Sequence, residues 1–172
     1  SELILRTNDE VVFLYRYEET PRKPYLMEWY TPKGVNVLRD APHDHLHHHG
    51  LMMAIKVNDV NYWEESEAGG YQSHQDFMDV RVSPDAGAFG IGFRERLNWH
   101  APGEAPPVSE IRSVYHSPLS NETVRVLTWQ SDFRLYFDRE QMRGQRPGGG
   151  FRQQSDTREP AVLGGNIYHG LG

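Results

Sequence analysis

Residues 88–99 have the sequence Ala-Phe-Gly-Ile-Gly-Phe-Arg-Glu-Arg-Leu-Asn-Trp, and this stretch decides the fold class of the chain. Its apolar and aromatic side chains recur at alternate positions, and a period of two places them on one face of an extended strand. Gly90 and Gly92 fall on the other face, where the missing side chains indicate a bulge or a close approach of another backbone. The apolar face is formed by Phe89, Ile91, Phe93, Leu97 and Trp99.

Short apolar and aromatic runs separated by turn residues continue along the chain on both sides of this stretch. Residues 31–34, Thr-Pro-Lys-Gly, fit a type I turn because proline is favoured at its second position and glycine at its fourth. We therefore expect a hairpin there. The run from Leu51 to Val57 is apolar on both faces apart from Lys56, which predicts a central strand. The expected strands cover residues 11–17, 25–30, 35–38, 51–57, 60–63, 75–82, 88–99, 108–116 and 123–137.

The arrangement of these runs predicts one all-β domain. No stretch has the periodicity of a long amphipathic helix, so we expect an antiparallel β-sandwich, of jelly-roll type or similar. A length of 172 residues fits a single domain over residues 1–172. Residues 138–160 are rich in Arg, Gly and Gln, and we expect a mobile loop there. Residues 168–172 resemble the start of another structured segment, so a continuation beyond Gly172 stays open.

Composition excludes several classes of function. Eighteen basic and twenty-four acidic residues give a net charge of −6, which argues against a nucleic-acid partner. The chain has no cysteine, which excludes disulfides and thiolate metal sites. No apolar run approaches the roughly 18 residues that cross a bilayer, so we expect no membrane span. The compartment stays open between a bacterial cytoplasm and a secreted or periplasmic location after removal of a leader. Without a phosphate-binding loop or a complete dinucleotide fingerprint, we expect no nucleotide cofactor.

Five of the nine histidines lie within seven residues, in the segment Pro42-His43-Asp44-His45-Leu46-His47-His48-His49-Gly50. Imidazole transfers protons near neutral pH and binds divalent metals, so this segment marks where chemistry would take place. If the segment is extended, alternate histidines share a face; if it forms a helical turn, histidines four apart converge. The flanking proline and glycine favour a loop at the start of the 51–57 strand. Loops on rigid β scaffolds often carry functional sites.

The candidate site combines this segment with side chains from elsewhere in the chain. Tryptophan offers a stacking face to a sugar ring, and arginine holds anionic or hydroxylated ligands. The competing interpretation is a solvated loop whose histidines only make hydrogen bonds. The candidate catalytic residues are His45, His47, His48, His74 and Asp44. The candidate ligands of a divalent metal, with Zn, Ca, Mn and Cu considered, are His45, His47 and His74. The candidate substrate-binding residues are Arg39, Trp63, Glu64 and Arg96.

Residues 38–51, Leu-Arg-Asp-Ala-Pro-His-Asp-His-Leu-His-His-His-Gly-Leu, resemble a motif of the bacterial family labelled "methane oxygenase PmoA". The resemblance is specific over residues 23–65, and His74 resembles a further histidine that follows the motif. His49 stands where the family commonly has Arg, and Asp59 where it commonly has Gly. Methane oxygenase subunits are membrane proteins, so the label alone does not assign that chemistry to a chain without a span. The resemblance implies a mutarotase-like supersandwich, similar to aldose epimerases, in which histidine and a carboxylate shuttle protons at a sugar ring.

Three functions remain as alternatives. The first is a carbohydrate-active protein, a sugar-modifying enzyme of lyase, hydrolase or epimerase type. Such an enzyme would act on a small-molecule or oligosaccharide ligand by acid–base or metal-assisted chemistry. The second is a non-catalytic glycan-binding β-sandwich, and the third is a copper-binding protein, as the family label suggests. We expect the first, while the oligomeric state stays open.

Overall fold

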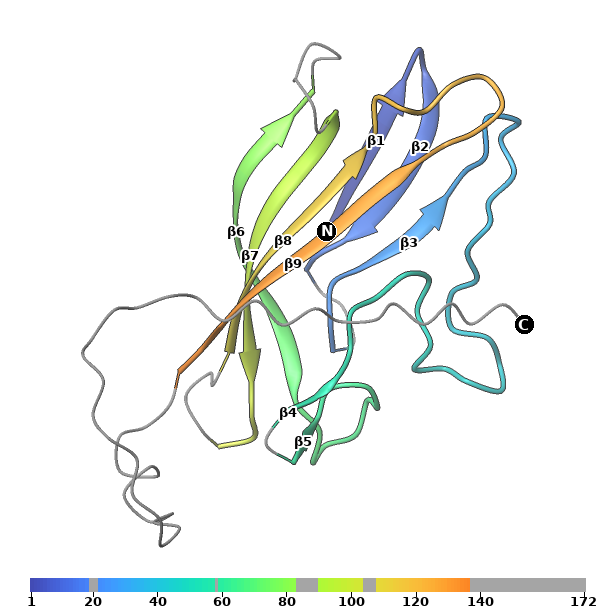
Figure 1. Cartoon of the computed structure of the whole chain (residues 1–172). Helices are drawn as coiled ribbons and strands as arrows, with labels where there is room; N and C mark the ends of the chain where they lie inside the picture. Colours follow the sequence, from blue (N-terminus) through green and yellow to red (C-terminus); the bar gives the residue numbers. More distant parts are fainter. Residues whose placement is uncertain (19–21, 58, 83–89, 104–107, 137–172) are drawn as a thin grey trace, which may run out of the picture.

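The computed structural model describes residues 1–18, 22–57, 59–82, 90–103 and 108–136. These residues contain no helix, and their antiparallel sheets pack as a β-sandwich (Figure 1), which confirms the predicted fold class. No membrane-crossing helix occurs among them. The loop expected at residues 138–160 lies outside the described residues. The strands are β1 (Glu2–Thr7), β2 (Glu10–Arg16), β3 (Tyr25–Trp29), β4 (Lys56–Val57), β5 (Val60–Asn61), β6 (Tyr71–Arg81), β7 (Ile91–His100), β8 (Val108–His116) and β9 (Leu127–Leu135).

Two sheets form the layers of the sandwich. One has the strand order β1-β2-β3 and the other the order β6-β7-β8-β9, while the hairpin β4-β5 lies at one end of the larger sheet (Figure 1). Strands adjacent in each sheet are also adjacent in sequence, so both sheets are meanders. The described strands contain no Greek-key crossover, which a jelly roll requires.

The runs with the clearest alternation form strands as predicted. β8 has the predicted bounds, and β2, β3, β6, β7 and β9 overlap their expected runs. β1 has no counterpart among the expected strands. The turn at residues 31–34 forms, since the Gly34 N–H donates to the Thr31 carbonyl at 2.9 Å, but the strand expected after it is reduced to one bridge between Tyr30 and Asn36.

The central strand predicted for residues 51–57 is wrong. Only its last two residues form a strand, β4, while Leu51 makes a single bridge to Leu26 of β3. Met53 and Val57 instead pack against the inner face of the larger sheet. The apolar run therefore packs on the larger sheet instead of forming one of its strands. Both arrangements bury apolar side chains, so the sequence pattern does not distinguish them.

The close backbone approach predicted at Gly90, which precedes β7, and at Gly92 within it is confirmed. A Cβ on Gly92 would lie 2.0 Å from the carbonyl oxygen of Val114 on β8. Gly90 has a φ of 84°, and a Cβ there would lie 2.1 Å from the carbonyl oxygen of His116. Glycine thus allows the start of β7 to lie directly against β8 and the residues that follow it.

Two apolar clusters cover the inner face of the larger sheet. In the first, Phe93 and Val114 pack against Phe13 and Tyr15 of the smaller sheet. The second lies at the end near β4 and β5. It contains Tyr62, Leu97, Trp99 and Val108, with Met53, Val57, Val60 and Phe133 packed against them.

Charged side chains occupy the same inner face beside these clusters. Glu95, Arg112 and Ser131 are paired across β7, β8 and β9, and Glu110 lies two residues before Arg112 on β8. Glu95, Glu110 and Arg112 are fully buried. Burial of charge is tolerated only where each group is paired and hydrogen-bonded.

Arg112 meets this requirement with five hydrogen bonds. Its Nε and Nη2 donate to the two carboxylate oxygens of Glu110, at 2.9 and 2.8 Å. Nη2 also donates to Gln72 at 2.9 Å, and Nη1 donates to the Tyr15 hydroxyl at 3.0 Å and the Pro24 carbonyl at 2.8 Å. Burial alone would lower the pKa of Arg112, but its neighbours, with Glu110 foremost, raise that pKa above the ordinary value.

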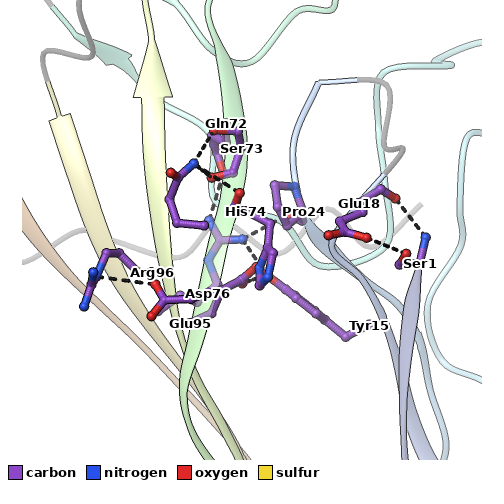
Figure 2. Close-up of polar contacts among 12 residues, drawn as sticks. Ser1, Tyr15, Glu18, Pro24, Gln72, Ser73, His74, Asp76, Glu95 and Arg96 are labelled. Carbon is purple, nitrogen blue, oxygen red and sulfur yellow. Dashed lines mark hydrogen bonds and ion pairs between the residues drawn. The ribbon is translucent and has the colours of Figure 1, made fainter.

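Tyr15 extends the network to a second carboxylate. Its hydroxyl donates to Oε2 of Glu95 at 2.5 Å, while Oε1 of Glu95 lies 2.7 Å from Nδ1 of His74 (Figure 2). Burial raises the pKa of Tyr15 well above its ordinary value, so the phenol keeps its proton. The network therefore joins β2, β6, β7 and β8 through polar contacts.

We predict that Arg112→Met destabilises the protein by about 3–5 kcal/mol, because it leaves the Glu110 carboxylate buried without its cation. Denaturant unfolding measures the change. Arg134→Met is the matched control, since Arg134 is exposed on β9, and it should change stability by less than about 0.5 kcal/mol. A loss below about 1 kcal/mol for Arg112→Met would contradict this interpretation.

Candidate functional site

The histidine segment is attached to the sandwich immediately after its last histidine. Leu51 exchanges two backbone hydrogen bonds of 2.9 Å with Leu26 of β3. Gly50 lies so close to β3 that a Cβ there would be 2.0 Å from the Leu26 carbonyl oxygen. The glycine that ends the segment therefore lets the chain approach β3 and fixes where the histidines end.

The segment is neither of the two regular conformations considered from sequence. Two successive turns form it, with the His45 N–H donating to the Pro42 carbonyl at 2.8 Å and the His48 N–H donating to the His45 carbonyl at 2.9 Å. The Ala41 N–H donates to the His48 carbonyl at 2.8 Å, which closes the loop. In this closed loop, the side chain of His49 points in a different direction from the side chains of the other histidines.

His49 is the buried histidine of the segment, and both of its ring nitrogens contact carboxylates. Nδ1 lies 2.7 Å from Oδ1 of Asp40, and Nε2 lies 3.0 Å from Oε1 of Glu65. The side chain is only 4% exposed. A neutral imidazole has one N–H, so donation to both carboxylates requires the doubly protonated ring.

Lys23 binds the same oxygen of Glu65 from a second side. Its ammonium donates to Oε1 of Glu65 at 2.9 Å and to the Trp63 carbonyl at 3.2 Å. Burial lowers the pKa of Lys23, and Glu65 partly opposes that shift. Lys23 therefore places a buried positive charge directly against Glu65.

Tyr25 supports this arrangement from β3. Its ring stacks on the His49 ring with centroids 4.5 Å apart, and its hydroxyl donates to Oδ2 of Asp40 at 3.1 Å. Arg16 of β2 donates to the same hydroxyl at 3.3 Å. Burial raises the pKa of Tyr25, so the hydroxyl remains a donor. We call Lys23, Tyr25, Asp40, His49 and Glu65 the carboxylate–histidine cluster.

The earlier histidines form a ring-packed group beside this cluster. The His45 and His48 rings stack with centroids 4.7 Å apart, and the His47 ring lies edge-on to His48 at 4.5 Å. His48 also packs edge-on against Trp63, with centroids 5.5 Å apart. Trp63 is 40% exposed, so its ring remains available to a ligand. We call these four residues the imidazole–tryptophan patch.

The charges around the patch favour neutral imidazole at His48. Burial lowers the pKa of His48, and the nearby His47, His45 and Lys23 lower it further. Asp44 lies 3.2 Å from Nδ1 of His45, and the pKa of Asp44 is lowered by a backbone hydrogen bond and by His45. A neutral His48 can both donate and accept a hydrogen bond.

The structure brings together some of the predicted site residues and separates others. The patch contains His45, His47, His48 and Trp63, with Asp44 beside it and Arg39 close enough to lower the pKa of Asp44. Glu64 is exposed next to Trp63, and its N–H donates to Asn61 at 3.3 Å.

His74 and Arg96 lie away from the patch on the larger sheet. The His74 ring contacts Tyr17 and Phe77 on the inner face and bonds to Glu95. Arg96 pairs with Asp76 at 3.6 Å on the other side of the sheet (Figure 2). The described residues contain no group of three or more His, Asp or Glu side chains arranged to hold a metal. His74 therefore belongs to the buried network, in which its Nδ1 contacts the carboxylate of Glu95.

Sequence reasoning did not assign the carboxylate–histidine cluster. His49 was one of five histidines within seven residues, and no pattern in the loop distinguished the one that points inward. Asp40 precedes the histidine segment and Glu65 follows Trp63. Their closeness in sequence to these two features was the only indication of their role. Lys23 gave no signal, because a buried lysine is recognised only from its surroundings.

Chemically, the cluster presents a carboxylate with one oxygen fixed. Oε1 of Glu65 accepts hydrogen bonds from Lys23 and His49, and among the described residues no group bonds to Oε2. The Glu65 side chain is 16% exposed. Such a group can accept or donate a proton at Oε2 while its orientation is maintained.

We predict that the imidazole of His48 titrates below the ordinary pKa of 6.5, and that His47→Asn raises this pKa by removing a neighbouring positive charge. Titration of the ring proton signals by NMR measures both. His43→Asn, an exposed histidine of the same segment, is the control and should leave the His48 midpoint unchanged. A midpoint above 6.5 in the unmodified protein would contradict the prediction.

Comparison with known proteins gives a family without an assigned activity. No curated protein and no solved structure matches the chain. A family model described as a family of unknown function, DUF6807, matches residues 2–152, which include the carboxylate–histidine cluster and the imidazole–tryptophan patch. The chain therefore belongs to the DUF6807 family of unknown function.

Proposed function

We propose that this protein is a carbohydrate-active enzyme in which Glu65 transfers a proton to or from a sugar bound at the imidazole–tryptophan patch. The observation that supports this most strongly is the position of the Glu65 carboxylate. Lys23 donates both to Glu65 and to the backbone carbonyl of Trp63, so the carboxylate lies close to the backbone of the residue that carries the exposed ring. Acid–base groups beside an aromatic platform suit proton transfer at a sugar.

In this proposal Glu65 exchanges the proton and its neighbours position it. Lys23 and His49 hold Oε1, and Asp40 and Tyr25 hold His49 in turn. Oε2 takes a proton from a sugar carbon or hydroxyl and returns it to the product, so no net charge is left in the site. Proton transfer of this kind is shared by epimerase, lyase and hydrolase reactions.

The patch would bind the sugar. The Trp63 face can stack on the apolar face of a pyranose ring, and neutral His48 can bond to its hydroxyls. The exposed His45 and the half-buried His47 can extend the contact to a second sugar unit of an oligosaccharide. A divalent ion bound by these two imidazoles would be an additional feature, which elemental analysis of untagged protein tests.

One observation favours a second candidate, a non-catalytic glycan-binding protein. Both His49 nitrogens are already bonded, and the ring is almost fully buried, as is common for a histidine with a structural role. In this case the carboxylate–histidine cluster would only fix the loop that presents Trp63.

We predict that Glu65→Gln slows turnover by about 10²–10⁴-fold but keeps binding. Proton NMR in D₂O with a panel of monosaccharides and oligosaccharides follows both deuterium exchange at sugar carbons and product formation. Glu67→Gln is the matched control, because Glu67 is exposed two residues away, and it should keep the rate.

Trp63→Ala should weaken binding of the same sugars, which saturation-transfer NMR measures. Sugar binding without any exchange or product would select the glycan-binding candidate over the enzyme. Full turnover in Glu65→Gln would exclude the assigned role of Glu65, and unchanged binding in Trp63→Ala would exclude the patch as the sugar site.

A further inference from the structure

The outer face of the larger sheet carries polar side chains and is separate from the site described above. Arg94 on β7, Ser113 on β8 and Gln130 on β9 form one row across it, since Arg94 pairs with Ser113 and Ser113 with Gln130. Tyr115 pairs with Thr128 in the next row. These side chains line a hollow of about 200 Å³ together with Arg81 and Asp132.

Arg94 differs from the other arginines around this hollow. Arg81 bonds to Asp79 at 2.7 Å and lies over the Tyr115 ring at 5.5 Å. Arg96, one row away, pairs with Asp76. Within the described part of the chain, no hydrogen bond or ion pair engages the guanidinium of Arg94, although the residue is partly buried. A partly buried cation without an anion favours binding of one.

The groups around Arg94 suit a ligand with hydroxyls as well as a negative charge. Ser113 and Thr128 offer hydroxyls, and Gln130 offers an amide that already donates to both oxygens of Asp132, at 3.1 and 3.0 Å. Asp132 can accept bonds from ligand hydroxyls, but it would repel a ligand whose charge is not held at Arg94. This arrangement favours a ligand that places its negative charge at Arg94 and also carries hydroxyl groups.

The larger hollow of the molecule is a weaker candidate. It measures about 670 Å³ and its cation is Arg125, which already bonds to Glu10 at 2.9 Å and to the Val11 carbonyl at 3.0 Å. Because this arginine is already paired, it does not point to an anionic ligand.

We propose that the hollow around Arg94 is a binding site for the carboxylate of a sugar acid. The guanidinium would form two parallel hydrogen bonds with the carboxylate, while Ser113, Thr128 and Asp132 bond to ring hydroxyls. This site is on a different surface from the imidazole–tryptophan patch, and the inference does not depend on the proposed enzymatic function.

Calorimetric titration with glucuronate, glucose and acetate tests the proposal. We expect glucuronate to bind and both glucose and acetate to bind at least about tenfold more weakly, because each lacks one set of contacts. Arg94→Gln should weaken glucuronate binding by about tenfold or more. Gln130→Leu should also weaken it, since it releases Asp132 from its amide partner.

One control variant locates the binding. Arg134→Gln, which changes an exposed arginine on β9 outside the hollow, should leave glucuronate affinity unchanged. The inference is wrong if glucuronate does not bind, if acetate or glucose binds equally well, or if folded Arg94→Gln retains full affinity. Loss of glucuronate binding in Trp63→Ala alone would assign the ligand to the patch and overturn this site.

Discussion

The buried guanidinium of Arg112 is the constraint on which the rest of the structure depends. Its five hydrogen bonds reach β8, β2, β6 and the residue before β3, so a single cation joins both layers of the sandwich. A buried ion pair adds little net stability compared with apolar packing, but removal of one partner is costly. The network therefore acts mainly by specifying which segments meet, and the apolar clusters beside it supply most of the driving force for folding.

The same network reaches the candidate site through three consecutive residues. Arg112 bonds to the carbonyl of Pro24, while Lys23 and Tyr25 on either side of it contact Glu65 and His49. A rigid backbone at this point limits the positions that the lysine and the aromatic ring can take. The carboxylate–histidine cluster is thus preorganised by the core, which lowers the cost of holding an acid–base group in one orientation.

Sequence periodicity predicted the fold class and most strands, because the alternation along β7 reflects burial of one face. It did not predict the buried charges, since Glu95 and Arg112 occupy inward positions where the pattern leads one to expect apolar residues. Within the histidine segment, residue type marked a region in which several imidazole rings pack together. The direction of each ring depends on two turns and on the approach of Gly50 to β3, which residue type alone does not encode. His74 was grouped with the segment by type, although its partner Glu95 is buried in the sheet.

The coupling between the core network and the site can be measured directly by a double-mutant cycle with Arg112→Lys and Lys23→Met, each scored by denaturant unfolding. Lysine keeps the charge at position 112 but cannot maintain all five hydrogen bonds of the guanidinium. We expect a coupling energy above about 0.5 kcal/mol, because the contact at Pro24 links the two side chains. Additivity within about 0.3 kcal/mol would contradict the conclusion that the core network positions the carboxylate–histidine cluster.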